Sequence, residues 1–466
     1  MFSSRRSTRR SPEWFEAMPT EFQIGFVVLI GGLLIAGKAS QALPFLEQAD
    51  KELINAGATI SAILTGTFIY WTFGRRALEM RKAKGRLATL SPENDLLIGT
   101  SGQPHRAASN RLGVVAHMAQ ISNRDSTFST PVLHDFCRTL FRRAAIAKTP
   151  EDWMRLRPHI APPAQTVLRG LLKEGALAEV HVGRVHINRV EEQRSGVAMH
   201  ISVHALTRDD AGNLRFLDMN WDLRRGQNAT SMTPMDVDQL GCPACGSPVE
   251  LSFPDGTCAV CESRIAYGDL GWQIFDLGWR GDRPLVPDRL GPLEGGVDAT
   301  LEPETPVDPH LAANLRALKM RHESFDLSEA ESRFKETLLA LQLAFDTGDM
   351  TPIEPLVTPG IRDTVALQVA RAGAGELTWR RRDVKVDGIE AVRVFRDAWH
   401  EMFDVRIRFQ MISAIVDAQD ICVAGSLSEP KHLSVYLCFH QRITPEPFAL
   451  TRWKLWRVVS PGAFLR

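Results

Sequence analysis

The sequence predicts an α+β protein built from two similar α+β units, with a metal-binding module between them and a pair of membrane-spanning helices before them. Three observations lead to this prediction. Helical apolar spacing followed by strand-like alternation occurs twice, four cysteines stand in two close pairs near the middle, and two uncharged apolar runs open the chain. The 466 residues leave room for about three domains. Because 55 basic residues balance 55 acidic ones, the overall charge does not favour a nucleic-acid partner.

A basic segment, residues 1–21, precedes the two apolar runs. The first run, residues 22–37, has 16 residues and is slightly short for a membrane span of ~20 residues, so a buried core helix or a signal-peptide core is the alternative. The second run, residues 53–74, has 22 residues and is long enough to span. We therefore expect a transmembrane hairpin over residues 22–74.

The distribution of charge orients this hairpin. Four arginines precede the first run and six basic residues follow the second, whereas the connecting loop 38–52 has two lysines against three acidic residues. The positive-inside rule then places both termini in the cytoplasm of a bacterium, with two spans in its inner membrane. The arginine-rich, acid-free start is also typical of a mitochondrial transit peptide, which is the alternative. Small residues at four-residue spacing allow the second span to pack on the first or into an oligomer: Ala58, Ala62 and Gly66.

The four cysteines follow the pattern C-x2-C-x12-C-x2-C: Cys242, Cys245, Cys258 and Cys261. Two close pairs of thiolates are typical of a tetrahedral structural zinc site with no open coordination position, and we expect one Zn2+ per chain. Two disulfides are the alternative, but they would require an oxidising compartment, which disagrees with a cytoplasmic location. The remaining cysteines lie in apolar contexts typical of buried thiols: Cys137, Cys422 and Cys438.

The two α+β units are expected at residues 128–240 and 311–466. Each begins with a helix of i, i+4 apolar spacing, continues through a turn and a second helix, and then changes to alternating strands. Prolines of the turns correspond at a constant offset of 197 residues: Pro158 with Pro355, and Pro162 with Pro359. Each unit closes with the pattern W-x-L-x-R, so that Trp221 corresponds to Trp453. We expect both tryptophans to be buried against the first helix of their own unit.

Three segments connect these parts. Residues 75–127 are expected to form a basic helix and a tether. Residues 241–280 hold the zinc ribbon and a following strand. Residues 281–310 are rich in proline and acidic residues, a composition that cannot build a core, and we expect a solvated linker there.

Several motifs of the second unit resemble the Tim44-like family, named for the mitochondrial inner-membrane translocase subunit that tethers the import motor. They are Leu341-Gln342 and Ala344-Phe345 in the first helix, Asp349, Thr358-Pro359 in the turn, and Trp453 to Arg457 in the last strand. The resemblance covers most of residues 128–457. It implies two cone-shaped domains similar to nuclear transport factor two, an apolar pocket under each sheet, and contact with membrane lipid and partner proteins. The first unit departs from the pattern, because Ala-Pro-Pro replaces Thr-Pro and its first helix lacks the L-Q pair.

Two further groups of residues are candidates for function. His200 and His204 share one strand face near Asp218 and Asp222, a pattern compatible with acid–base chemistry or with an ordinary solvated face. The run Trp379, Arg380, Arg381 and Arg382 is a candidate contact with phosphate groups of lipid or of a partner, or a solvated edge. The sequence contains neither G-x-S-x-G nor H-E-x-x-H.

We therefore expect a scaffold or tether without catalytic activity, anchored in the inner membrane and presenting protein- or lipid-binding domains to the cytoplasm. Such a protein would act in protein transport or in the assembly of membrane complexes. One alternative is an enzyme that uses the apolar pocket of an α+β domain. The other is a nucleic-acid-binding zinc ribbon, which the acidic composition of the ribbon disfavours: Glu250, Asp255 and Glu262 against Arg264.

Overall fold

The computed structural model describes nine stretches of the chain. They are residues 117–172, 177–193, 195–247, 257–264, 271–279, 297–298, 307–374, 376–443 and 453–459. The chain divides into two compact units, residues 1–85 and 86–466, and every described residue belongs to the second. The expected transmembrane hairpin over residues 22–74 lies outside the described residues. Within the described stretches, no helix combines the length and apolar character needed to cross a membrane.

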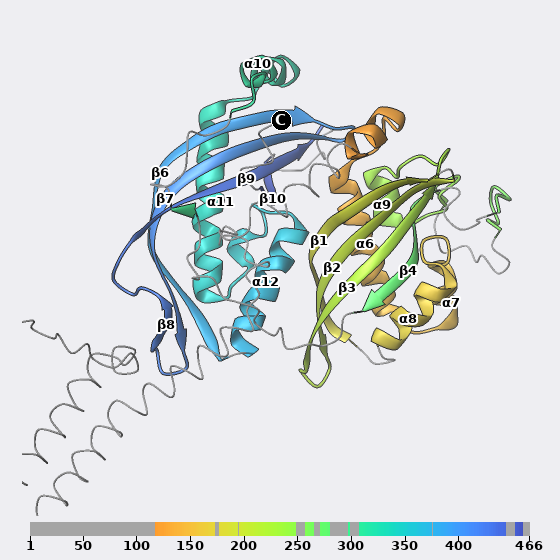
Figure 1. The fold of residues 1–466 in the computed structure, drawn as a ribbon, viewed down its shortest axis with the longest axis horizontal. Helices are drawn as coiled ribbons and strands as arrows, with labels where there is room; N and C mark the ends of the chain where they lie inside the picture. Colours follow the sequence, from red (N-terminus) through yellow and green to blue (C-terminus); the bar gives the residue numbers. More distant parts are fainter. Residues whose placement is uncertain are drawn as a thin grey trace, which may run out of the picture. The chain divides into compact units, whose positions relative to one another are not determined.

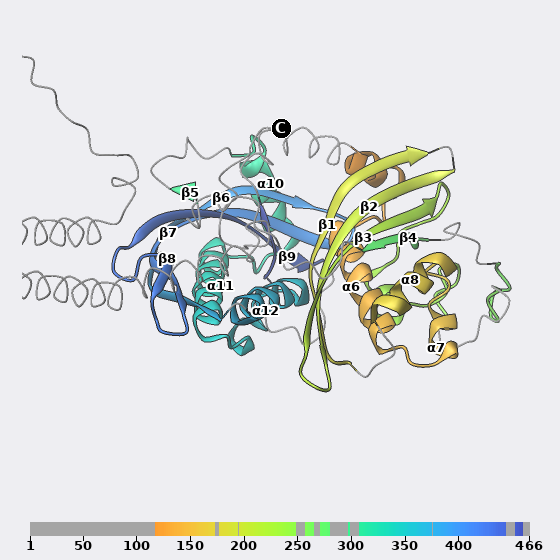
Figure 2. The ribbon, with the colours of Figure 1, turned by 60° about the horizontal axis from the view of Figure 1, so that its bottom comes forward.

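One antiparallel sheet of four strands organises the first lobe, which comprises the described residues up to 279. The strands lie in the order β1-β2-β3-β4: β1 (Leu177–Gln193), β2 (Gly196–Asp209), β3 (Leu214–Gly226) and β4 (Gln273–Trp279). Three helices lie on one side of this sheet (Figures 1 and 2): α6 (Thr130–Ile146), α7 (Pro150–Arg155) and α8 (Pro162–Leu172). A short helix, α9 (Pro234–Gln239), follows β3.

Helix α6 shows how local sequence positions the core of this lobe. The Ser129 hydroxyl caps the helix by accepting a hydrogen bond from the Val132 N–H (3.5 Å), and Pro131 occupies the first turn, where no amide is needed. The apolar face of the helix is buried against the sheet. The ring of Trp221 on β3 stacks on Phe141 of α6, with centroids 6.3 Å apart, and Trp221 is 0% exposed. The expected burial of Trp221 against the first helix is confirmed.

The second lobe, which comprises the described residues from 297 onward, contains a larger antiparallel sheet whose main strands lie in the order β10-β9-β7-β6. The strands are β6 (Leu377–Arg396), β7 (His400–Asp417), β9 (Lys431–Arg442) and β10 (Lys454–Val459), with β8 (Cys422–Gly425) on β7 and β5 (Val297–Asp298) on β9. The helices are α10 (Leu311–Arg321), α11 (Leu327–Thr347) and α12 (Pro359–Ala374), with the short 3-10 helix η3 (Thr351–Ile353) before α12. Helix α11 ends at Gly348, whose φ of 75° lies in the left-handed region that glycine adopts without strain.

Aromatic rings fill the space between α11 and its sheet. The centroid of Phe334 on α11 lies 4.2 Å from that of Phe439 and 5.4 Å from that of Phe403. Trp453 packs edge-on against Phe334 (6.3 Å) and Phe403 (5.8 Å) and is 6% exposed. Its expected burial against the first helix of its unit is confirmed.

The two lobes repeat one topology, including its irregular features. The turn before α8 forms a parallel bridge from Ile160 to Ile274 of β4, and the turn before α12 forms the same bridge from Val357 to Leu455 of β10. The last strand of each sheet also has a β-bulge directly after the bridged residue, where its register with the neighbouring strand shifts. By these features, β10 of the second lobe corresponds to β4 of the first.

This topology corrects one part of the sequence alignment. The pattern W-x-L-x-R pairs Trp221 with Trp453, but Trp221 lies on the third strand of its sheet, whereas Trp453 directly precedes the fourth. The residue equivalent to Trp453 is Trp272, which directly precedes β4. The alignment failed because residues 227–272, which include the four cysteines, are inserted between the third and fourth strands. The expected zinc ribbon therefore interrupts the first sheet and does not lie between two complete units.

Helix α12 of the second lobe packs on the edge strand β1 of the first. Asp363 of α12 is fully buried, and its carboxylate accepts a hydrogen bond from the Val182 N–H (2.9 Å) and lies 3.2 Å from Nδ1 of His181. It also pairs with Arg142 of α6. Burial alone would raise the pKa of Asp363, but the His181 hydrogen bond, the Arg142 charge and the Val182 N–H outweigh it and lower that pKa. The Val182 N–H, at the open edge of the first sheet, thereby has a hydrogen-bond acceptor in the second lobe.

Several further contacts join the lobes, among them Ser129 with Asp397 and His134 with Trp456. The indole Nε1 of Trp399 in the second lobe donates a hydrogen bond to the carbonyl oxygen of Thr127 in the first (3.0 Å). Gly183 of β1 lies so close to α12 that a Cβ at this position would stand 3.2 Å from the Cα of Thr364. The contact therefore includes close backbone packing as well as polar side chains.

The equivalence of Trp272 and Trp453 leads to a stability prediction. We expect Trp272→Ala and Trp453→Ala to lower the free energy of unfolding by about 3–5 kcal/mol each, because each removes a buried ring beside a fourth strand. Trp279→Ala is the matched control, since this ring on β4 is 43% exposed, and we expect a change of at most ~0.5 kcal/mol. Urea unfolding followed by circular dichroism measures all three. A cost for Trp272→Ala no larger than that for Trp279→Ala would contradict the equivalence.

Candidate metal centre

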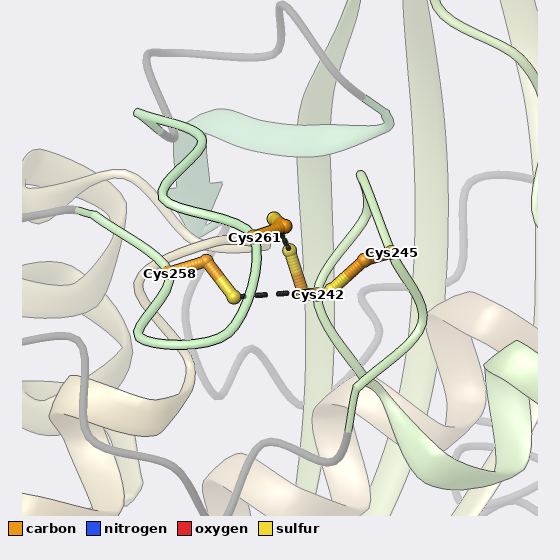
Figure 3. Close-up of side chains that lie close together, drawn as sticks. All are labelled: Cys242, Cys245, Cys258 and Cys261. Atoms are coloured by element: carbon orange, nitrogen blue, oxygen red, sulfur yellow. Dashed lines mark hydrogen bonds between the residues drawn. The ribbon is translucent and has the colours of Figure 1, made fainter.

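The four cysteines lie together at the ends of two facing turns (Figure 3). The sulfurs of Cys242 and Cys261 are 3.9 Å apart, as are those of Cys245 and Cys258. All four sulfurs lie within 4.8 Å of one another. Among the described residues, this is the one group of three or more His, Cys, Asp or Glu side chains placed to bind a metal ion together. The sequence-based grouping of these four cysteines is therefore reproduced by the fold.

Each cysteine pair is held by the same kind of turn. In the first turn, the Gly246 N–H donates to the Cys242 carbonyl (2.7 Å), and the Ala244 N–H donates to the Cys242 sulfur (3.4 Å). In the second, the Glu262 N–H donates to the Cys258 carbonyl (2.9 Å). Gly246 and Glu262 close their turns with φ values of 70° and 56°. Backbone N–H groups directed at sulfur stabilise the thiolate, which is the form that binds metal.

The thiols differ in their proton affinity. Burial raises the pKa of Cys258, but N–H groups of Cys261 and Val260 and the Ser247 hydroxyl outweigh it, and its pKa is lowered to about 6. Burial raises the pKa of Cys242 to about 12. Four close thiolates without a cation would repel one another, which favours the protonated form of Cys242 in the absence of a metal ion.

His159 connects the first cysteine turn to the helices of the first lobe. It is 1% exposed, its ring packs edge-on against Phe136 (5.6 Å), and its Nε2 lies 3.2 Å from the carbonyl oxygen of Gly241, next to Cys242. Burial lowers the pKa of His159 to about 4, so the ring is neutral and donates to that carbonyl. The sequence gives little indication of this role, because a single histidine after Pro158 has no ligand-like spacing.

The expected contact surface of Trp379, Arg380, Arg381 and Arg382 is not one exposed patch. These residues lie on β6, where successive side chains point to opposite faces of the sheet. Trp379 and Arg381 are 7% and 5% exposed, and the Arg381 guanidinium lies 4.0 Å from the Phe345 ring centroid and donates to Oε1 of Gln342 (2.8 Å). Arg380 pairs with Asp420 (3.0 Å). The run of basic residues concealed this alternation, and only Arg380 and Arg382 remain on the outer face.

The four candidates on the first sheet form cross-strand pairs. His200 pairs with Asp222 and His204 with Asp218 in the register of β2 and β3. Nδ1 of His200 is 2.5 Å from Oδ1 of Asp222, and these side chains are 37% and 34% exposed. The neighbouring residues of both strands, such as Ile201 and Trp221, point to the helix side and are 0% exposed. The His204 and Asp218 side chains are 16% and 26% exposed, so this sheet face is half-buried.

Comparison with known proteins bears on the second lobe. Residues 311–459 match the family model described as a Tim44-like domain. No curated protein matches the chain. Solved structures with weak similarity to this chain include the following two. The intermembrane-space region of the chloroplast protein ARC6 is 12% identical, with 29% of this chain and 95% of that one covered and a TM-score of 0.21. An Ntf2-like protein involved in plasmid conjugation is 7% identical, with 68% and 92% covered and a TM-score of 0.18. TM-scores this low do not establish a common fold.

Proposed function

We propose that this chain, whose residues 311–459 are a Tim44-like domain, is a membrane-anchored scaffold that presents protein- or lipid-binding domains to the bacterial cytoplasm. The hairpin over residues 22–74 anchors it in the inner membrane, both termini face the cytoplasm, and residues 75–127 tether the lobes to the anchor. The protein holds partner proteins at the membrane during protein transport or the assembly of membrane complexes. The match to the Tim44-like domain carries this proposal, because members of that family are associated with membranes.

The first lobe is also a domain of the Tim44-like type. It is formed by residues 128–240 together with β4 from the segment 241–280. The domain of the second lobe spans residues 311–466. The linker 281–310 joins it to the first lobe, and within that linker β5 pairs with β9 of the second lobe. Both have the cone shape of nuclear transport factor two. The bridges at Ile274 and Leu455 support this assignment, because they repeat the same local pairing in both lobes.

The four cysteines bind one structural zinc ion per chain. A tetrahedral site with Zn–S bonds of ~2.3 Å places its sulfurs ~3.8 Å apart, and the 3.9 Å separations in both facing cysteine pairs support this geometry. Protein sulfurs fill every coordination position, so the ion stabilises the fold and has no position for a substrate. Because the cysteines lie between β3 and β4, the ion fixes the connection that returns β4 to its sheet.

The alternative functions have less support from the described residues. In the second lobe, the rings of Phe334, Phe439 and Trp453 pack between α11 and its sheet, and none of them is an acid or a base. The histidine–aspartate pairs are cross-strand neighbours on a half-buried sheet face. At the second cysteine turn, the exposed residues include Ala259, Val260 and Glu262, which do not suit a phosphate backbone.

The zinc proposal predicts the metal content of cysteine variants. The purified full-length protein should contain one zinc ion per chain, and Cys242→Ser or Cys261→Ser should lose it, because three thiolates close a structural site poorly. Cys422→Ser is the control, since this thiol lies on β8 outside the cluster and the variant should retain its zinc. Elemental analysis by mass spectrometry measures the content. Zinc retained in both cluster variants would refute the four-cysteine site.

The scaffold proposal predicts both location and partners. Reporter fusions should place residue 45 outside the cytoplasm and residues 100 and 460 inside it, and deletion of residues 1–85 should release the remaining unit from carbonate-washed membranes. Crosslinking in membranes, followed by purification, should recover specific membrane or cytoplasmic proteins with the full-length chain. A carboxy terminus outside the cytoplasm, or membrane retention of the deletion variant equal to that of the full chain, would contradict the proposed anchor.

A further inference from the structure

We propose that the first lobe binds a small organic anion with an aliphatic body, in a pocket between α6 and the beginning of β1. The pocket has a volume of about 360 Å3. Its apolar lining consists of Ile146, Leu177 and Val180, and its charged lining consists of Arg142, Arg143 and Glu179. The volume lies at the lower end of the roughly 300–1,000 Å3 that is usual for small-molecule sites.

The charges at the pocket favour an anion. Glu179 is already engaged by Nε2 of His181 (2.6 Å) and Nε of Arg208 (3.0 Å), and Arg142 is paired with Asp363. In the described part of the chain, no side chain pairs with Arg143. Among the described residues, the positive charge of Arg143 is therefore not compensated by an acidic side chain. Arg142 retains guanidinium donors beyond the one given to Asp363. The anionic head group of a ligand, placed between Arg142 and Arg143, would form ion pairs with both guanidinium groups.

The apolar lining favours a ligand with an aliphatic body. The side chain of Ile146 lies at the end of α6 and is 59% exposed, beside the partly buried side chains of Leu177 and Val180. A ligand that covers Ile146 removes this surface from water, which an inorganic ion cannot do. A space of about 360 Å3 is large enough for a short- to medium-chain carboxylate. Both the anionic head group and the aliphatic body of the ligand are therefore needed for binding.

Arg143 is the residue to test, because it is exposed and outside the contact between the lobes, whereas loss of Arg142 would also remove the partner of Asp363. The full-length protein in nanodiscs of zwitterionic lipid is titrated with octanoate by calorimetry, and parallel titrations use octanol and acetate. The variants are Arg143→Gln, Arg143→Lys and, as a matched control, Arg155→Gln, which changes an exposed arginine of α7 outside the pocket.

We expect octanoate to bind the wild type with a Kd of about 1 mM or below. Arg143→Gln should weaken binding about three- to tenfold, Arg143→Lys should restore most of it, and Arg155→Gln should leave it unchanged. Octanol and acetate, which lack the charge and the aliphatic body respectively, should bind at least about tenfold more weakly. All variants share the same lipid background, so a difference between them originates in the pocket.

Three results would overturn the proposal. They are the absence of saturable octanoate binding to the wild type, equal octanoate affinity in Arg143→Gln, and octanol affinity equal to that of octanoate. A fourth measurement separates a free carboxylate from a lipid headgroup: vesicles containing phosphatidylglycerol are tested in place of octanoate. If only vesicles bind, and Arg143→Gln binds them as the wild type does, the pocket is not the site. Circular dichroism of Arg143→Gln establishes that the variant is folded.

Discussion

The buried carboxylate of Asp363 is shared by both lobes, and the arrangement of the described structure depends on it. It projects from α12 of the second lobe and is bound by Arg142, His181 and the N–H of Val182 in the first. A carboxylate with 0% exposure is costly unless it is paired and hydrogen-bonded. Its partners come from a helix and from a strand edge, so the pairing fixes two elements of the first lobe against one helix of the second. Removing one member of such a buried group typically costs 3–5 kcal/mol.

Insertion of the cysteines into the first sheet places a second constraint on that lobe. In the second lobe, residues 443–453 connect β9 to β10, whereas in the first, residues 227–272 separate β3 from β4. A longer connection costs more entropy to close, and the two cysteine turns shorten it when one metal ion binds all four sulfurs. The neutral His159 ring then attaches the first turn to the core through Phe136 and Gly241. The four-cysteine cluster thus lies in the connection that completes the sheet.

Local patterns predicted the elements of this protein well, and long-range contacts poorly. Three patterns depend only on residues close together in the sequence. They are the i, i+4 spacing of α6 and α11, the alternation in the strands, and the cysteine spacing. Asp363 could not be identified in this way, because an acidic residue on a helix resembles any solvated one until the opposing lobe is known. The equivalence of Trp272 and Trp453 was missed since an insertion separated the last strand of one copy from its sheet. The alternation that buries Trp379 and Arg381 was concealed by a run of three arginines.

The most direct test of this account is hydrogen–deuterium exchange on wild type and Asp363→Asn, with Asp420→Asn as the control. Asp420 also pairs with an arginine, but its side chain is 76% exposed. If Asp363 holds the lobes together, amides of β1 (Leu177–Gln193) and of α12 (Pro359–Ala374) should exchange at least about tenfold faster in Asp363→Asn, while those of β9 keep their protection. Unchanged protection of both β1 and α12 in Asp363→Asn, or equal loss in Asp420→Asn, would contradict the account.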